Sequence, residues 1–181
     1  MLPVIPILWL VTREIKRTRE LFRKLAIQLN GEMTLLPFGL RYERHDLQIR
    51  IYAQGGIQYR ARVRLRANPG ILVTRKFSRL KFLDSLNYSP SRQPFLFRTS
   101  IDDEYGFRAK DTRWMREIFS RELLSRLSAT DRVRRIQISR RVLSGSILLF
   151  SNSAQEHDKA SEAVDILNEL SGRLCRSSLA Q

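Results

Sequence analysis

The chain of 181 residues is strongly basic, with 33 Lys and Arg against 18 Asp and Glu and a net charge of +15. Its hydrophobic content of 43% is enough to bury a core, which excludes a disordered tail and favours one domain with at most an appendage. A single cysteine, Cys175, excludes an intrachain disulfide, and two histidines without a cysteine cluster argue against a structural zinc site. The charge favours negative partners such as polyanions or anionic lipid headgroups.

Residues 1–11, MLPVIPILWLV, contain no charged side chain and form a candidate membrane anchor. As a helix they would span about 17 Å against a hydrocarbon core of about 30 Å, so they are too short to cross a bilayer alone. The segment also lacks the basic start and small-residue cleavage site of a secretory signal. It is therefore the end of a longer span, a partial insertion beside a partner, or a buried helix end. The candidate anchor residues are Leu2, Val4, Ile5, Ile7, Leu8, Trp9, Leu10 and Val11.

A dense basic segment follows directly and places the chain relative to a membrane. Trp9 at the apolar edge and a basic flank are typical of an interfacial anchor whose basic side is cytoplasmic. This predicts the cytoplasmic face of a bacterial inner membrane, and the alternative is a cytoplasmic protein whose apolar start packs on its own core. The flank consists of Arg13, Lys16, Arg17, Arg19, Arg23 and Lys24.

From Arg13 the spacing of apolar residues becomes helical, and Asn30-Gly31 is a suitable C-cap. We therefore expect one helix from about Pro6 to Asn30. This divides the chain into an apolar segment and helical stem over residues 1–30 and a single domain over residues 31–181.

After Gly31 the period changes to two, which is typical of strands. Residues 47–51 and 57–65 alternate around a turn at residues 54–56 and predict a hairpin, and a second turn at residues 67–70 leads to a strand over residues 71–77. Two prolines then lead into a strand at residues 95–101.

The C-terminal half predicts two helices around two more strands. Asp111 is a suitable N-cap for a helix over residues 112–127, followed by strands at residues 133–139 and 142–151. Ser153 and Glu156 have capping-box spacing before a final amphipathic helix. The sequence thus predicts an α+β domain in which two helices cover one face of an antiparallel sheet of five to six strands, preceded by the helical stem.

Several stretches together resemble bacterial membrane-tethered α+β domains of unknown function. They are the basic-flanked apolar segment, the stem ending in LAIQLNGEM, the hairpin IYAQGGIQYRARVRL, the stretch FLFRTSIDDE before the helix TRWMREIFSRELLSRL, and the two strands and helix at the end. The resemblance implies attachment to a bacterial membrane and no established activity.

No residue set in the sequence predicts catalysis or a cofactor. Phosphate-loop, dinucleotide-binding and nucleophile-elbow motifs are missing, so we expect a protein that is not an enzyme. Asp102, Asp103 and Glu104 form a dense acidic cluster, which is more typical of a solvated loop before a helix than of a cation site. His45 beside Asp46 is more typical of a surface ion pair, and Cys175 of a packing or exposed residue.

The most informative stretch is YRARVRLR, residues 59–66, in which arginine occupies every second position. In a strand these arginines share one face and repeat every ~6.6 Å, close to the roughly 6 to 7 Å between adjacent phosphates of an extended nucleic-acid strand. They are candidates for binding a polyanion or a lipid headgroup, unless acidic residues on a neighbouring strand or chain neutralise them. The candidate set is Arg60, Arg62, Arg64 and Arg66, with Arg50 on the neighbouring strand.

Two functions compete for this arginine row. The first is a non-enzymatic binding or scaffolding domain at the cytoplasmic face, with an anionic membrane surface or a membrane protein as its partner. The second is RNA or single-stranded nucleic-acid binding through the sheet, although such sheets present aromatic side chains outward and Tyr59 lies on the opposite face from the arginines. An acidic protein partner would also suit the row.

Overall fold

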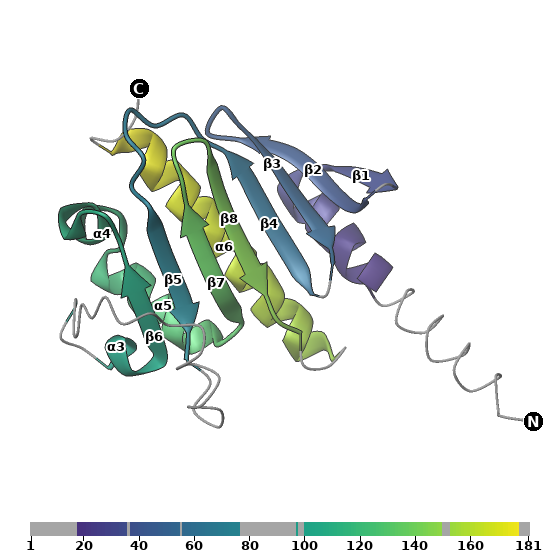
Figure 1. The fold of residues 1–181 in the computed structure, drawn as a ribbon. Coiled ribbons are helices and arrows are strands. Elements are labelled where there is room, and N and C mark those ends of the chain that lie inside the picture. The colour runs from purple at the N-terminus through teal and green to yellow at the C-terminus, as the bar shows by residue number, and fades with distance from the viewer. Residues whose placement is uncertain are drawn as a thin grey trace, which may run out of the picture.

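The computed structural model describes residues 18–35, 37–54, 56–76, 97, 100–149 and 153–177. The described strands form one sheet in the order β1-β2-β3-β4-β8-β7-β5-β6, and every neighbouring pair is antiparallel (Figure 1). The strands are β1 (Glu32–Leu35), β2 (Phe38–Arg44), β3 (Leu47–Ala53), β4 (Ile57–Arg62), β5 (Ile71–Arg75), β6 (Tyr105–Arg108), β7 (Val133–Ile138) and β8 (Val142–Ile147).

This sheet confirms the predicted α+β class, but the expected five to six strands were too few. The hairpin of β3 and β4 has the predicted turn, in which the Gln54 amide donates to the Gly56 carbonyl at 2.9 Å. The strands β1 and β2 were missed. The strand expected at residues 95–101 is also wrong at its described end, because Ile101 begins a short helix and β6 starts only at Tyr105.

The helices also outnumber the two that were expected beside the stem. They are α3 (Ile101–Glu104), α4 (Thr112–Ile118), α5 (Arg121–Thr130) and α6 (Ala154–Arg176), and residues 18–29 are helical as well. The predicted helix after Asp111 is divided in two. Asp111 caps α4 as expected, accepting from the Arg113 amide at 2.9 Å, but Phe119 is extended and buried and the Ser120 hydroxyl caps α5.

The described end of the stem is part of the domain core. Leu21, Phe22 and Leu25 are at most 1% exposed, and the Phe22 ring packs edge-on against Phe38 of β2 with centroids 5.4 Å apart. Asn30 ends this helix in the left-handed region at φ 49°, and the Gly31 amide reaches back to the Ala26 carbonyl at 2.9 Å. The predicted cap is thus confirmed.

Figure 1 shows two layers, with α6 crossing diagonally behind the sheet and the other helices on the same side. Ser153 caps α6 as predicted, because its hydroxyl accepts from the Glu156 amide at 3.2 Å, and the Glu156 carboxylate pairs with Arg132. The predicted apolar stripe lies entirely in the core and consists of Ala160, Ala163, Val164, Leu167, Leu170 and Leu174.

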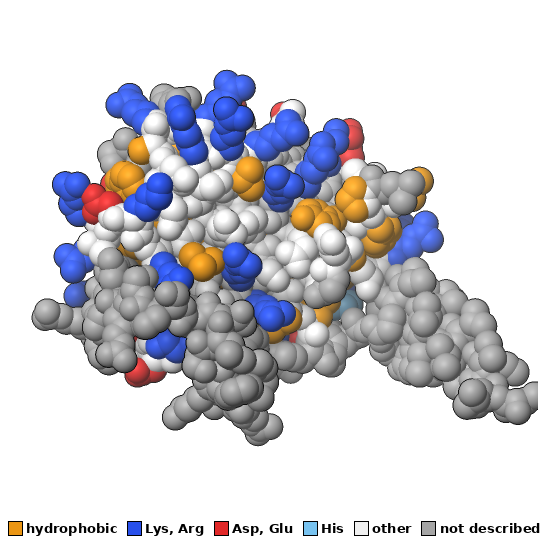
Figure 2. Space-filling view, viewed as in Figure 1, with side chains coloured by type: hydrophobic (Ala, Val, Ile, Leu, Met, Phe, Trp, Pro, Cys, Tyr) orange, Lys and Arg blue, Asp and Glu red, His pale blue; other side chains and the backbone are white. Residues whose placement is uncertain are grey.

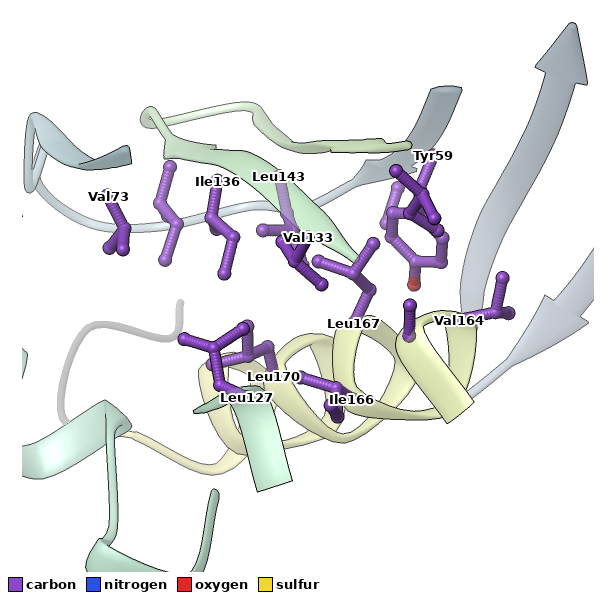
Figure 3. Packing of buried hydrophobic residues seen from close by; sticks show 14 of the residues in the cluster. Tyr59, Val73, Leu127, Val133, Ile136, Leu143, Val164, Ile166, Leu167 and Leu170 are labelled. Atoms are coloured by element: carbon purple, nitrogen blue, oxygen red, sulfur yellow. The ribbon is translucent and has the colours of Figure 1, made fainter. Parts of the chain in front are cut away.

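Gly145 allows α6 to approach the middle of the sheet. It lies on the covered face of β8, directly between Tyr59 of β4 and Ile136 of β7. A Cβ at this position would be 2.5 Å from Cδ1 of Leu167, so any larger residue would force Leu167 to move. Figure 3 shows Leu167 reaching from α6 toward the sheet between Tyr59 and Val133.

A buried polar network beside this contact fixes the register of α6. The hydroxyls of Tyr42 and Tyr59 both donate to Oδ1 of Asn168, at 2.6 and 3.1 Å, and Ser171 donates to the Asn168 carbonyl at 2.7 Å. Burial raises the pKa of both Tyr42 and Tyr59 above the usual range, which keeps these phenols protonated as donors. One amide thus ties α6 to both β2 and β4.

We predict that Gly145→Val lowers the free energy of unfolding by about 1–3 kcal/mol, because the added side chain overpacks the contact with Leu167. Urea unfolding followed by circular dichroism measures the change. Ser144→Ala, a half-buried position one residue away on the opposite face, is the control and should shift stability by less than about 0.5 kcal/mol. If both variants were equally stable, close packing at Gly145 would not be required.

Candidate anion-binding face of the sheet

The face of the sheet opposite the helices, here called the outer face, carries the candidate site. Inward side chains of β3 and β4 alternate with exposed or half-exposed outward ones. Across this face the eight strands contain several arginines but only two acidic residues, Glu32 and Glu43. Figure 2 shows this face, with Lys and Arg side chains along its upper margin and further ones lower over the sheet.

The structure places the predicted arginine row on the outer face. The residues between these arginines, including Tyr59, Val63 and Leu65, are at most 3% exposed. The strand β4 ends at Arg62, yet the alternation continues because the amides of Val63 and Leu65 donate to the carbonyls of Arg141 and Arg140, each at 3.0 Å. The exposed members of the row are Arg60, Arg62, Arg64 and Arg66.

A second alignment of arginines crosses the row at right angles. Arg41 of β2, Arg50 of β3 and Arg60 of β4 are direct cross-strand partners. Directly opposed like charges destabilise a sheet, so this register carries a cost in stability. The predicted Arg50 is thus brought to the centre of the basic face, beside Arg60.

On the described strands, the acidic neighbours of these arginines lie only toward the β1 edge of the sheet. Glu32 lies opposite Arg41, and Glu43 lies opposite Gln48. Among the described residues, no ion pair or side-chain hydrogen bond engages any guanidinium of this group, which consists of Arg41, Arg50, Arg60, Arg62, Arg64 and Arg66. Neutralisation by a neighbouring strand, the simpler explanation of the row, therefore lacks support in this structure.

Two further arginine pairs on this side were missed by the sequence analysis. Arg140 and Arg141 form the turn between β7 and β8 and extend the basic margin beside the row. Arg134 and Arg135 are adjacent yet both exposed, because the register shifts between Val133 and Arg135. Consecutive arginines that interrupt the alternation of VRRIQI are a sequence signal for such a bulge.

The predicted anchor and part of its basic flank lie outside the described residues. This applies to Leu2, Val4, Ile5, Ile7, Leu8, Trp9, Leu10 and Val11, and to Arg13, Lys16 and Arg17. The rest of the flank, Arg19, Arg23 and Lys24, is exposed on the first described helix. Between residues 18 and 177, the described helices include none with the length and apolar character to cross a bilayer.

The acidic cluster forms specific protein contacts. Asp102 accepts from the Phe97 amide at 3.1 Å, and Glu104 accepts from the Ser128 hydroxyl at 2.6 Å. In the described parts of the chain, no three His, Cys, Asp or Glu side chains gather where they could hold a metal ion.

His45 and Asp46 form the tight turn between β2 and β3, with φ of 52° and 59°. Burial raises the pKa of Cys175, which stays mostly in the thiol form.

Comparisons with known proteins find a similar fold but identify no family for this chain. No protein-family model and no curated protein matches the chain. A crystal structure of the mycobacterial trehalose monomycolate transport factor A, TtfA, is similar in fold, with a TM-score of 0.54 and 11% sequence identity. The match covers 90% of this chain and 99% of that one, so the similarity extends over the whole architecture.

We predict that Arg50→Gln raises the free energy of unfolding by a few tenths of a kcal/mol, up to about 1 kcal/mol, because it removes a charge between Arg41 and Arg60. The gain should shrink as salt screens the repulsion. Thermal unfolding at low and high sodium chloride measures it, with Arg23→Gln, at an exposed position within the helix at residues 18–29, as the control. A loss of stability in the Arg50 variant would mean that its charge is satisfied in solution.

Proposed function

We propose that this protein is a non-enzymatic binding or scaffolding domain that presents the outer face of its sheet to an anionic membrane surface at the cytoplasmic face of a bacterial inner membrane. The observation that carries the proposal is the arginine row, Arg60, Arg62, Arg64 and Arg66, exposed beside Arg50 with no acidic partner among the described residues. Each basic residue close to an anionic membrane contributes on the order of 1 kcal/mol. The candidate membrane anchor and basic flank of the sequence would hold the domain near such a surface.

The similar structure supports a binding role in a limited way. That protein is a transport factor for trehalose monomycolate. At 11% identity it supports the fold, and a role in handling the same molecule does not follow for this chain. A membrane-protein or acidic protein partner would use the same basic face.

Nucleic-acid binding is less well supported. Sheets that bind single strands stack bases on outward aromatic side chains. On the described strands, Tyr52 is the one aromatic residue on the outer face, and it is half-buried between Gly39 and Gln58. Tyr59, which accompanies the arginine row, is 1% exposed and bonded to Asn168.

We predict that replacing Arg60, Arg62 and Arg64 with Gln weakens binding to vesicles that contain phosphatidylserine by up to about 3 kcal/mol, or about a hundredfold. Co-sedimentation of the full chain with phosphatidylcholine vesicles, with and without phosphatidylserine, measures the binding. The matched control replaces Arg116, Arg121 and Arg176, three exposed arginines of α4, α5 and α6, and should bind almost as well as the original chain.

Equal binding by the row variant and the original chain would contradict the assignment of the row. Loss of binding to both kinds of vesicle would also contradict it, because the row is proposed to recognise negative charge. The original chain could instead fail to bind vesicles and bind single-stranded RNA more tightly than the row variant does. In that case the nucleic-acid alternative would replace this proposal.

A further inference from the structure

A hollow of about 560 Å³ opens on the outer face and extends from Gln58, two residues before Arg60 on β4, toward the β6 edge. Its volume lies within the range of sites for small ligands. Five strands supply its lining, which consists of Gln58, Leu72, Thr74, Arg108, Arg134, Arg135 and Ser146. Three of these seven side chains are guanidinium groups, none is acidic, and the others include two hydroxyls and an amide.

The strand register explains how these side chains come together. Thr74 of β5 lies directly opposite Arg135 of β7, Arg135 lies opposite Ser146 of β8, and Ser146 lies opposite Gln58 of β4. These four residues therefore form one continuous line across four strands, with partners about 5 Å apart. Arg135 has a short hydroxyl side chain on either side, so its guanidinium group projects beyond its neighbours and the hollow forms around it.

The bulge in β7 supplies the second arginine. A regular strand would direct Arg134 toward the helices, but the shifted register turns it outward beside Arg135. Arg108 of β6 approaches from the other side, where it lies opposite Leu72 of β5. The guanidinium groups thus come from two strands that are separated by β5, on either side of the hollow.

Hydrogen bonds orient part of the lining. Nη2 of Arg135 donates to Oε1 of Gln137 at 3.1 Å, which leaves most of its five N–H donors for other acceptors. Nε2 of Gln58 donates to Oγ of Ser146 at 3.3 Å, so the Ser146 hydroxyl keeps its own proton to donate. In the described part of the chain, Arg135 forms no ion pair.

We propose that this hollow binds a phosphate group, either free or as the headgroup of a lipid. Guanidinium groups bind phosphate oxygens in pairs of hydrogen bonds, and donors on opposite sides suit a tetrahedral anion. The hydroxyls of Thr74 and Ser146 add neutral donors between the charges. Binding of free phosphate is independent of the proposed function. Binding of a lipid headgroup rests on the proposed function, since a bound headgroup would orient the basic face on the membrane.

The first test titrates the full chain with inorganic phosphate at constant ionic strength and follows binding by calorimetry and backbone amide shifts. We expect saturable binding with the largest shifts in β5, β7 and β8. Arg135→Gln should weaken it about tenfold, because it removes charge-assisted hydrogen bonds at the centre of the site. Thr74→Val, which keeps the shape and removes a donor, should weaken it less.

The control is Arg141→Gln, an exposed arginine in the turn at the other end of β7. It removes the same charge close to the opposite end of the same strand and should change phosphate affinity less than about twofold. Absence of saturable binding, or an equal loss in the Arg141 variant, would overturn the proposal. An equal loss would show that phosphate responds only to the overall field of the protein.

Vesicles of phosphatidylcholine with phosphatidic acid distinguish the two sources of phosphate. If phosphate binding is saturable and Arg135→Gln also weakens vesicle binding, the ligand is a lipid headgroup. If Arg135→Gln affects only the titration with inorganic phosphate, the ligand is free in solution. If only the proposal for the hollow is wrong, the row variant will still bind phosphatidylserine vesicles more weakly than the original chain. If only the proposed function is wrong, binding of inorganic phosphate will remain intact.

Discussion

The close contact between α6 and the centre of the sheet determines what the other face can do. Gly145 admits Leu167, and Asn168 accepts from Tyr42 and Tyr59, so one helix is fixed against the middle of eight strands. Once the helices occupy a single face, the alternation of each strand leaves its remaining side chains directed away from them. The outer face is therefore a direct consequence of the helix packing, and its chemistry is set by every second residue of each strand.

Arginines on the two faces have different surroundings. On the helical side, Arg126 of α5 contacts both Glu162 and Glu169 of α6, with N–O distances of 2.6–2.7 Å. Arg132 forms a bidentate pair with Glu156, at 2.8 and 2.5 Å, and both side chains are at most 10% exposed. On both sides of the molecule other described arginines are exposed without such a pair, among them Arg60 on the outer face and Arg116 on α4. The ion pairs described here therefore fix α5 and α6, whereas the arginines of the row contribute charge and not internal contacts.

The sequence predicted those parts of the fold that have long or regular periodicity. The stripe of α6 extends over more than three turns, and the hairpin of β3 and β4 carries a glycine turn, so both were identified. The strand β1 is four residues long, and the turn after β2 uses His45 and Asp46 in left-handed conformations in place of the usual glycine. Local patterns were too weak there, and packing against the helix at residues 18–29 decides the structure.

The candidate site was predictable along a strand but not between strands. Period two alone placed Arg60 and its neighbours on one face, whereas the opposition of Arg50 and Arg60 depends on a register that no local signal reveals. The bulge at Arg134 and Arg135 likewise requires knowledge of how β7 pairs with β8. The hollow joins strands that are far apart in the sequence, so its lining was beyond reach of sequence analysis.

The register also shows how the proposed row site and the proposed hollow lie relative to each other. From Arg60, successive cross-strand partners are Ser144, Gln137, Leu72 and Arg108, so three uncharged residues lie between the row and the far wall of the hollow. Four strand spacings amount to roughly 19 Å, which is more than twice the Debye length of about 8 Å at physiological salt. Charges at Arg60 and Arg108 therefore interact weakly, whereas Gln58 at the near wall of the hollow is only two residues from Arg60 on β4. The two proposed sites thus adjoin at Gln58, so a phosphate group held in the hollow would lie beside a surface bound along the row.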